Sequence, residues 1–319
     1  MVQSVGVRVH ALGLLAGACA LACVFSAAAA EGGPRFIGPL ASPAPTLPAG
    51  AGNIEPYLVA GRTSSVFDGS GDRHAVDTPN SWSLLLPMQY GLTDWLTLGL
   101  TVRGAFDTTQ DGSRRDLSLG DSTVSALVGL YDGAGPSRMR VAAGVRRGLA
   151  TGRHDQLQPE KQSGNGSGAD TTTLALQSQM YAHDGFLRLR AAAAWRLPGA
   201  HAQVQGASVY GTTAGFQGRA TLGAGLVTTA SAEYSISPRW TLVGEAMYER
   251  NSGTRVSGVN ADGSVLADAP LRSWRASLLP AVQYHFSDAV GVIAGVQVPV
   301  AGRNTANTVA PQVAVNIGF

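Results

Sequence analysis

The last twelve residues, TVAPQVAVNIGF, constrain the fold more than any other stretch of the chain. Every second residue from Val309 to Phe319 is apolar, apart from Pro311, and the residues between them are small or polar. A period of two is typical of a strand with one apolar and one polar side. The sequence therefore ends on an amphipathic strand whose final side chain is aromatic.

A terminal strand of this kind resembles the sorting signal of bacterial outer-membrane β-barrels. The other end of the chain agrees with export. Arg8 and His10 precede an apolar run over residues 11–25, and small residues follow up to Ala30. This pattern predicts a secretory signal peptide over residues 1–30, cleaved after Ala30, because the run is too short for a spanning helix. We therefore expect a bacterial outer-membrane protein.

Both cysteines of the chain, Cys19 and Cys23, lie inside the predicted signal peptide. A lipoprotein signal is an alternative, but Ala16 and Ala20 stand where such signals usually have leucine. Cleavage after Ala30 leaves a mature chain without cysteine. That chain can form neither a disulfide nor a thiolate metal site.

The composition favours a barrel over a soluble domain. Charged residues make up only 14% of the chain, against roughly 25% in soluble domains. A transmembrane barrel needs apolar residues on its lipid face, small and polar residues in its lumen, and pairing of every backbone group between strands. No dense cluster of lysine and arginine suggests a nucleic-acid partner.

A proline-rich leader over residues 31–52 precedes the predicted barrel, which covers residues 53–319. Five prolines between positions 34 and 48 favour an extended chain on the periplasmic side over a strand. We expect a disordered tail here, with a lumen plug as the less favoured alternative.

Twelve strand-like segments separated by turn residues predict an antiparallel, up-and-down transmembrane β-barrel in an all-β chain. Tight and long connections alternate between them, as short periplasmic turns and long outer loops do in such barrels. An even number of strands places both chain ends in the periplasm. Ten or fourteen strands remain alternatives. The segments are 53–62, 80–91, 95–106, 118–131, 138–149, 170–182, 186–197, 219–235, 239–250, 272–286, 290–300 and 308–319.

Aromatic side chains gather near the ends of these segments, as in the headgroup girdles of membrane barrels. Charged and polar residues take the opposite parity to the apolar ones. A charge on the lipid face at mid-depth costs about 2–4 kcal/mol, so the lumen is their expected place. The predicted lumen-lining residues are Arg103, Asp121, Arg138, Arg140, Arg146, Gln177, Arg188, Arg190, Arg196, Glu233, Glu245, Arg275, Gln283 and His285.

These lumen charges suggest two compatible uses. Ion pairs across the lumen stabilise a filled barrel, whereas a polar constriction selects solutes. Enzymatic motifs are less convincing. Asp121 and Ser122 belong to a Gly-Asp-Ser triplet that is similar to a lipase motif, but in a strand they point to opposite sides. His285 faces inward, which argues against the lipid-facing Ser and His of barrel phospholipases. The loop histidines have no metal-ligand spacing, and one glycine-rich repeat at 164–170 is better read as a loop than as a calcium site. We expect no catalytic residue, metal or cofactor.

Several stretches are similar to one family of outer-membrane proteins, the transporter-like proteins named for the meta-pathway of phenol degradation. They include YGLTDWLTLGL (90–100), LSLGDSTVSAL (117–127), RRGLATGRH (146–154), TLVGEAMYE (241–249) and the closing segment from residue 278. The family has a Pro-Thr-Gly element where this chain has Ala150-Thr151-Gly152. The resemblance covers most of residues 53–319 and implies a barrel that passes hydrophobic or aromatic small molecules.

Two functions from different classes follow. The first is a passive outer-membrane channel for small solutes, hydrophobic or aromatic ones among them. The second is a closed barrel with a binding, adhesive or structural role, because strand count does not decide whether a lumen is open. The expected partners are outer-membrane lipid, a small-molecule solute and the barrel-assembly machinery, which would read the strand ending at Phe319.

Overall fold

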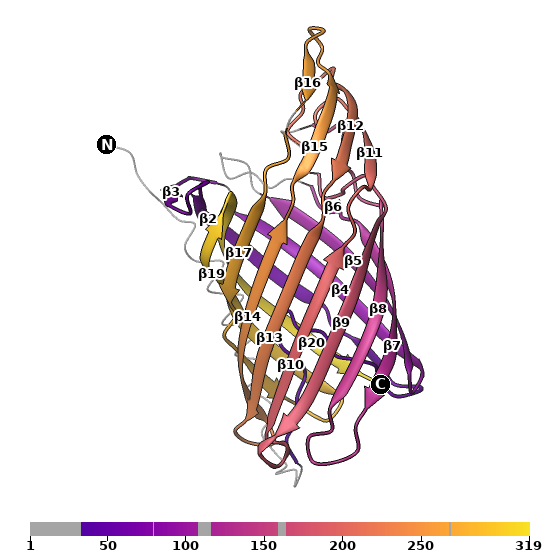
Figure 1. The fold of residues 1–319 in the computed structure, drawn as a ribbon. Helices are drawn as coiled ribbons and strands as arrows, with labels where there is room; N and C mark the ends of the chain where they lie inside the picture. The colour runs from indigo at the N-terminus through magenta and orange to yellow at the C-terminus, as the bar shows by residue number, and fades with distance from the viewer. Residues whose placement is uncertain (1–32, 79, 108–115, 159–163, 268) are drawn as a thin grey trace, which may run out of the picture. The chain divides into compact units, whose positions relative to one another are not determined.

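A single antiparallel sheet that closes on itself forms most of the molecule (Figure 1). The computed structural model describes residues 33–78, 80–107, 116–158, 164–267 and 269–319, so the predicted signal peptide lies outside the described residues. Residues Pro34–Phe319 form one compact unit. Within the described residues, no helix has the length and apolar character needed to cross a membrane.

The wall of the barrel has twelve strand positions, which confirms the predicted strand number. It closes because β1 and β2 together pair with β4 on one side and with β20 on the other. The wall strands are β1 (Gly52–Ile54), β2 (Tyr57–Phe67), β4 (Ser81–Thr93), β5 (Leu96–Asp107), β6 (Ser118–Leu119), β7 (Ser122–Asp132), β8 (Arg140–Leu149), β9 (Thr171–Ala182), β10 (Leu187–Arg196), β13 (Gly225–Ser235), β14 (Trp240–Asn251), β17 (Ser273–Leu278), β18 (Ala281–His285), β19 (Val290–Arg303) and β20 (Thr305–Gly318).

Two of the twelve positions are interrupted by proline. Pro56 separates β1 from β2, and Pro280 separates β17 from β18. Proline has no backbone N–H to donate to a neighbouring strand, so regular pairing stops there. The proline carbonyls still accept hydrogen bonds, from the backbone N–H of Val315 and of Val296. The wall therefore continues across both breaks.

The two faces of the wall differ as the alternation in the sequence predicts. In β9, Leu174 and Leu176 are 46% and 51% exposed on the outside, while Gln177 and Gln179 are buried inside. The same order holds in β20, where Ala314 is buried and Val315 is exposed. An exposed leucine and valine surface of this kind suits lipid and not water.

The two ends of the barrel are distinct. We call one end the turn end. It holds the connections β4–β5, β7–β8, β9–β10, β13–β14 and β18–β19, together with the short 3-10 helix η1 (His183–Gly185) and the C-terminal Phe319. We call the opposite end the loop end. Aromatic rings lie near the turn end, where the rings of Trp240 and Tyr284 are 4.7 Å apart and those of Tyr284 and Phe286 are 5.1 Å apart. Trp82 and Phe106 stack near the loop end.

The proline-rich leader lies inside the barrel, so the expected disordered tail is wrong and the less favoured alternative, a segment in the lumen, is what the structure has. At the turn end, the Arg35 side chain pairs with Asp288 and its carbonyl accepts from Thr241. The leader then crosses the lumen to the opposite wall, where the Ala49 N–H donates to Asp94 at 2.9 Å. Both contacts are at turn-end residues, so residues 34–50 make a loop that enters and leaves at the same end.

An apolar cluster anchors the leader from within. Leu40 packs with Val243, Leu279, Ile293 and Ala314, all of which face the lumen and are buried. The leader therefore supplies part of a small hydrophobic core in a barrel that would otherwise expose these side chains to water.

A second sheet at the loop end was missed in the sequence. Four strands project beyond the barrel (Figure 1). Three of them lie in predicted long polar loops, and the fourth, residues 217–222, includes the start of the predicted barrel segment 219–235. Their core includes Val204, Phe216, Ala220 and Val256, all nearly inaccessible to solvent. The strands are β11 (His201–Gln205), β12 (Gln217–Leu222), β15 (Thr254–Val259) and β16 (Val265–Ala267), and a short β3 (Arg73–Ala75) pairs with β2 nearby.

The exit of the leader depends on a glycine in β4. A Cβ atom at Gly91 would lie 2.0 Å from the backbone oxygen of Pro48. We expect Gly91→Ala to displace the end of the leader and to lower the free energy of unfolding by about 1–3 kcal/mol. Urea unfolding followed by tryptophan fluorescence measures this change.

The matched control is Gly244→Ala in β14, where a Cβ would meet no atom within 4 Å. Equal unfolding midpoints for the two alanine variants would show that the leader does not press against Gly91.

Candidate functional site

A buried ion-pair cluster occupies the lumen in its turn half. The Arg188 guanidinium donates two hydrogen bonds to Glu233, at 2.7 and 2.8 Å. Gln283 donates to the same carboxylate at 2.7 Å, and Arg190 Nε lies 3.9 Å from it. The Glu233 side chain is fully buried. A carboxylate out of contact with water is stable only with such partners, so this cluster fixes β10, β13 and β18 against one another.

The leader binds directly to this cluster and to Glu245. The Ala41 N–H and the Ser42 hydroxyl both donate to the Glu245 carboxylate. Arg190 donates to the Ser42 carbonyl at 3.2 Å, and Gln283 donates to the Gly38 carbonyl at 2.8 Å. The lumen polar groups therefore satisfy backbone groups that the leader, which has no strand partner there, would leave unpaired.

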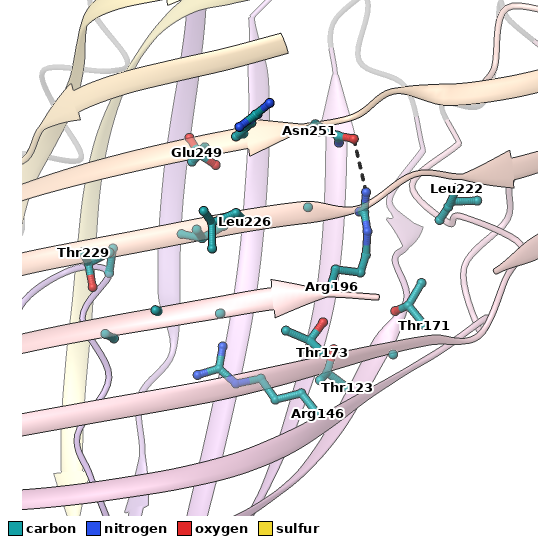
Figure 2. Close-up of a pocket in the computed structure, with 18 of the residues that line it drawn as sticks. Thr123, Arg146, Thr171, Thr173, Arg196, Leu222, Leu226, Thr229, Glu249 and Asn251 are labelled. Carbon is teal, nitrogen blue, oxygen red and sulfur yellow. Dashed lines mark hydrogen bonds between the residues drawn. The ribbon is translucent and has the colours of Figure 1, made fainter. Parts of the chain in front are cut away.

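Above the leader, the loop half of the lumen holds a cavity of about 600 Å³ (Figure 2). Ala41 and Pro43 of the leader line it together with the barrel wall. Arg146 and Arg196 extend into this space in Figure 2. The polar and charged lining residues are Arg103, Asp121, Thr123, Arg146, Ser167, Thr171, Thr173, Arg196, Thr229, Glu249, Arg250, Asn251, Ser273, Arg275 and Thr305.

A second cavity of about 340 Å³ adjoins the first at the loop end. The two share Arg103, Asp121 and Arg196, among other residues, and the second is also lined by Tyr210 from the outer loops. The Tyr210 hydroxyl donates to the Ser167 carbonyl. Burial raises the pKa of Tyr210 to about 12, so the hydroxyl stays protonated and remains a donor at neutral pH.

Asp121 holds two parts of the outer loop above the cavity. Its carboxylate accepts hydrogen bonds from the N–H groups of Gly152, at 3.0 Å, and Ser167, at 2.7 Å. We expect Asp121→Ala to speed hydrogen exchange at these two amides by about tenfold or more, because a hydrogen bond to a charged group contributes about 1.5–3 kcal/mol. Exchange measured by mass spectrometry checks this.

Asp121→Asn serves as the control, since the amide keeps one acceptor oxygen and should retain most of the protection. Unchanged exchange in Asp121→Ala would contradict the assigned role.

The structure separates the predicted lumen residues into two groups. Arg188, Arg190, Gln177, Glu233, Glu245, Gln283 and His285 are buried around the leader. Arg103, Asp121, Arg146, Arg196 and Arg275 line the outer cavity. Arg140 reaches Thr46 of the leader at 3.5 Å and pairs with Asp132. His285 has a buried Nε2 atom with no partner among the described residues.

Arg138 does not line the lumen, contrary to the prediction. It lies in the connection between β7 and β8, is exposed, and has a positive φ of 41°. Its N–H donates to the Gly135 carbonyl, and Gly133 bonds to Met139. Because of these turn hydrogen bonds, β8 begins only at Arg140. The alternation of a strand therefore does not extend back to Arg138 and does not set the direction of its side chain.

Several residues that line the cavity were not predicted from the sequence, and Asn251 and the two leader residues are examples. Asn251, the last residue of β14, accepts a hydrogen bond from Arg196 at 3.4 Å (Figure 2). Its parity with Glu249 was the signal that could have revealed it. Ala41 and Pro43 of the leader had no such signal, because an extended proline-rich segment carries no periodicity.

The residues considered for catalysis or metal binding are engaged separately. No three histidine, cysteine, aspartate or glutamate side chains of the described residues gather as a metal site would require. Asp121 binds the outer loop, whereas the Ser122 hydroxyl accepts from Thr151. Each loop histidine has its own separate partner. His74 contacts Asp68, His154 contacts the Gln203 carbonyl, and His201 contacts Thr221.

No protein-family model and no curated protein sequence matches the chain. Solved structures do. The COG4313 outer membrane channel from Pseudomonas putida F1 superposes with a TM-score of 0.64 over 86% of this chain and 97% of that chain, at 15% identity. The chain has the fold of an outer-membrane channel. Identity at this level supports the fold alone.

Two further solved structures are more distant. The NanC porin gives a TM-score of 0.47 at 9% identity, over 83% of this chain and 98% of that chain. The Pseudomonas putida toluene transporter TodX gives 0.41 at 12% identity, over 85% and 89%. These likenesses add nothing to the assignment of the fold.

Proposed function

We propose that the chain is an outer-membrane channel that passively admits small solutes, hydrophobic or aromatic ones among them. The observation that carries the proposal is the cavity of about 600 Å³ within the loop half of a closed barrel. A concave site with polar groups on a partly apolar wall is the usual form of a small-molecule site. The resemblance to transporter-like proteins of the phenol meta-pathway favours the same solute class.

The exposed apolar outer wall supports a place in lipid, and the predicted signal peptide supports export. In this arrangement the turn end and Phe319 face the periplasm, and the loop end faces the outside. The terminal strand is then the segment that the barrel-assembly machinery would read. No cofactor or catalytic step is part of the proposal, and the solute moves down its own gradient.

A solute that enters from the loop end meets Ala41 and Pro43 at the bottom of the cavity. Beyond them the leader holds the lumen through Glu245, Arg190 and Gln283. Passage along the barrel axis therefore requires the leader to move.

A second candidate is a closed barrel that acts in surface binding or adhesion or as a structural protein. Two observations favour it: the leader fills the turn half of the lumen, and the projecting sheet has its own buried core around Phe216. In this case the outer loops are the working part and no solute crosses.

Uptake into liposomes separates the two candidates. Liposomes that contain the mature protein, without residues 1–30, are given a radiolabelled aromatic acid. If the chain is a channel, we expect uptake well above that of protein-free liposomes. Because transport is passive, uptake should stop when the internal concentration of the acid equals the external one. Uptake no greater than in protein-free liposomes would favour the closed barrel.

A further inference from the structure

The outer cavity contains more positive charge than its own carboxylates neutralise. Arg103 from β5, Arg146 from β8 and Arg196 from β10 all line it. Within the described part of the chain, none of these three forms an ion pair with a carboxylate. Arg103 and Arg146 line the same cavity, so two like charges face one space. A set of arginines in this arrangement is stabilised by an anion.

The two carboxylates of the cavity are already engaged. Glu249 accepts from Arg275, with Nε at 2.9 Å, so these two side chains neutralise each other. Asp121 accepts from the backbone of Gly152 and Ser167. Neither carboxylate pairs with Arg103, Arg146 or Arg196, and the one negative charge of Asp121 does not balance the three arginines.

Strand register places two of the arginines at one level. Thr173 of β9 lies opposite Arg146 on one side and opposite Arg196 on the other. Neighbouring strands are about 4.8 Å apart, so the two arginine backbones are about 10 Å apart along the wall. Long guanidinium side chains can close most of that distance on a single small anion, with the Thr173 hydroxyl between them.

The existing partners of these arginines are neutral and few. Arg146 donates to Gln177 at 2.8 Å when the amide nitrogen of Gln177 faces the leader. Arg196 donates to Asn251 at 3.4 Å and to the Gly223 carbonyl at 3.1 Å. Its buried Nε has no partner within the described structure. A buried donor without an acceptor is costly, and a carboxylate oxygen of a ligand would satisfy it.

Small apolar residues line the cavity below this level. Ala194 of β10 lies opposite Val227 of β13, and both line the cavity, as does Ala192. Pro43 and Ala41 of the leader complete this apolar part. A ligand that fits both regions has a negatively charged head and a short apolar body.

We propose that the outer cavity binds small amphipathic carboxylates. The carboxylate lies between Arg146 and Arg196 with Arg103 nearby, and the apolar body rests on Ala194, Val227 and Pro43. This inference rests on the proposed channel function and gives its solute class. Ligands of this class have a head with one negative charge on an apolar ring or short apolar chain.

Binding of benzoate and of its neutral analogue benzamide to the mature protein in lipid nanodiscs tests the proposal. We expect benzoate to bind about tenfold more tightly than benzamide or better, and added salt to weaken benzoate alone. The double variant Arg146→Gln with Arg196→Gln should lose the preference for benzoate. Empty nanodiscs correct for uptake of the probes by lipid.

The matched control is Arg147→Gln. Arg147 is the next residue of β8, faces the opposite side, and pairs with Asp170 on the surface. The affinity of the Arg147→Gln variant for benzoate should be within about twofold of the parent's, since an exposed ion pair contributes little to stability. If the double variant does not fold, Arg103→Gln, which removes an exposed side chain of the same cavity, should weaken benzoate severalfold.

Equal affinity for benzoate and benzamide, no measurable benzoate binding, or equal losses in the cavity variants and Arg147→Gln would overturn the proposal. The liposome experiment separates this outcome from failure of the channel. Arginine-dependent binding without uptake refutes transport but keeps the site. Uptake of benzoate and benzamide at equal rates keeps the channel and refutes the site.

Discussion

Deletion of residues 34–48 should raise the single-channel conductance of the barrel severalfold. These residues fill the turn half of the lumen, where Ser42 contacts Glu245, and Leu47 donates to Thr97 at 2.7 Å. The wall strands begin only at Gly52, so the deletion removes no wall strand. A twelve-stranded barrel without its contents has room for water and ions. Planar-bilayer recordings of the deletion variant and the parent measure the difference.

A point variant tests the same idea without shortening the chain. Leu40→Ala removes a side chain from the cluster with Leu279 and Ile293. A large-to-small change in such a cluster costs about 2–5 kcal/mol, so the leader should leave the lumen more often and brief large openings should appear. If both variants conduct like the parent, the leader does not limit the lumen.

Arg188→Ala should lower the free energy of unfolding by about 3–5 kcal/mol, because it leaves the buried Glu233 carboxylate without its bidentate partner. The replacement also removes the contact of Arg188 with the Phe36 ring of the leader, 4.7 Å from the guanidinium carbon. Denaturant unfolding of the refolded variant in detergent, followed by tryptophan fluorescence, measures the loss.

Arg147→Ala is the matched control for this experiment. Its ion pair with Asp170 is about half exposed on both sides, so its loss should cost less than about 1 kcal/mol. A second comparison is Arg188→Met combined with Glu233→Leu, which removes the bidentate pair but leaves the buried Arg190 without a carboxylate nearby, so it should recover only part of the stability. If Arg188→Ala and Arg147→Ala lower the free energy of unfolding equally, the Arg188–Glu233 pair is hydrated and not buried.

The barrel wall could be predicted well from the sequence because alternate residues of a strand face opposite sides of the sheet. In β10, Arg188 and Arg190 are buried while Trp195 is exposed, as the alternation requires. The rule needs only local information, and lipid penalises every exception. It failed at Arg138 because a turn, and not a strand, sets the direction of that side chain.

The contents of the lumen were beyond such reasoning. The contact of Ser42 with Glu245 joins residues 203 positions apart, and nothing near Ser42 in the sequence announces it. The projecting sheet was different. In β11, Ala202 and Val204 are buried between exposed His201, Gln203 and Gln205, so a period of two was present. Five residues within a glycine-rich stretch were too short a signal to distinguish from a loop.

A cross-linking measurement shows whether the leader lies inside the barrel. Cysteines replace Ser42 and Glu245 in the chain without residues 1–30, which has no other cysteine. The control pair joins Ser42→Cys with Leu242→Cys, whose side chain is 50% exposed on the outer face of the same strand. A short bifunctional thiol reagent is applied to outer membranes, and mass spectrometry identifies the joined peptides. We expect a cross-link between positions 42 and 245 and none between 42 and 242. No cross-link in either pair, or equal yields in both, would place the leader outside the lumen.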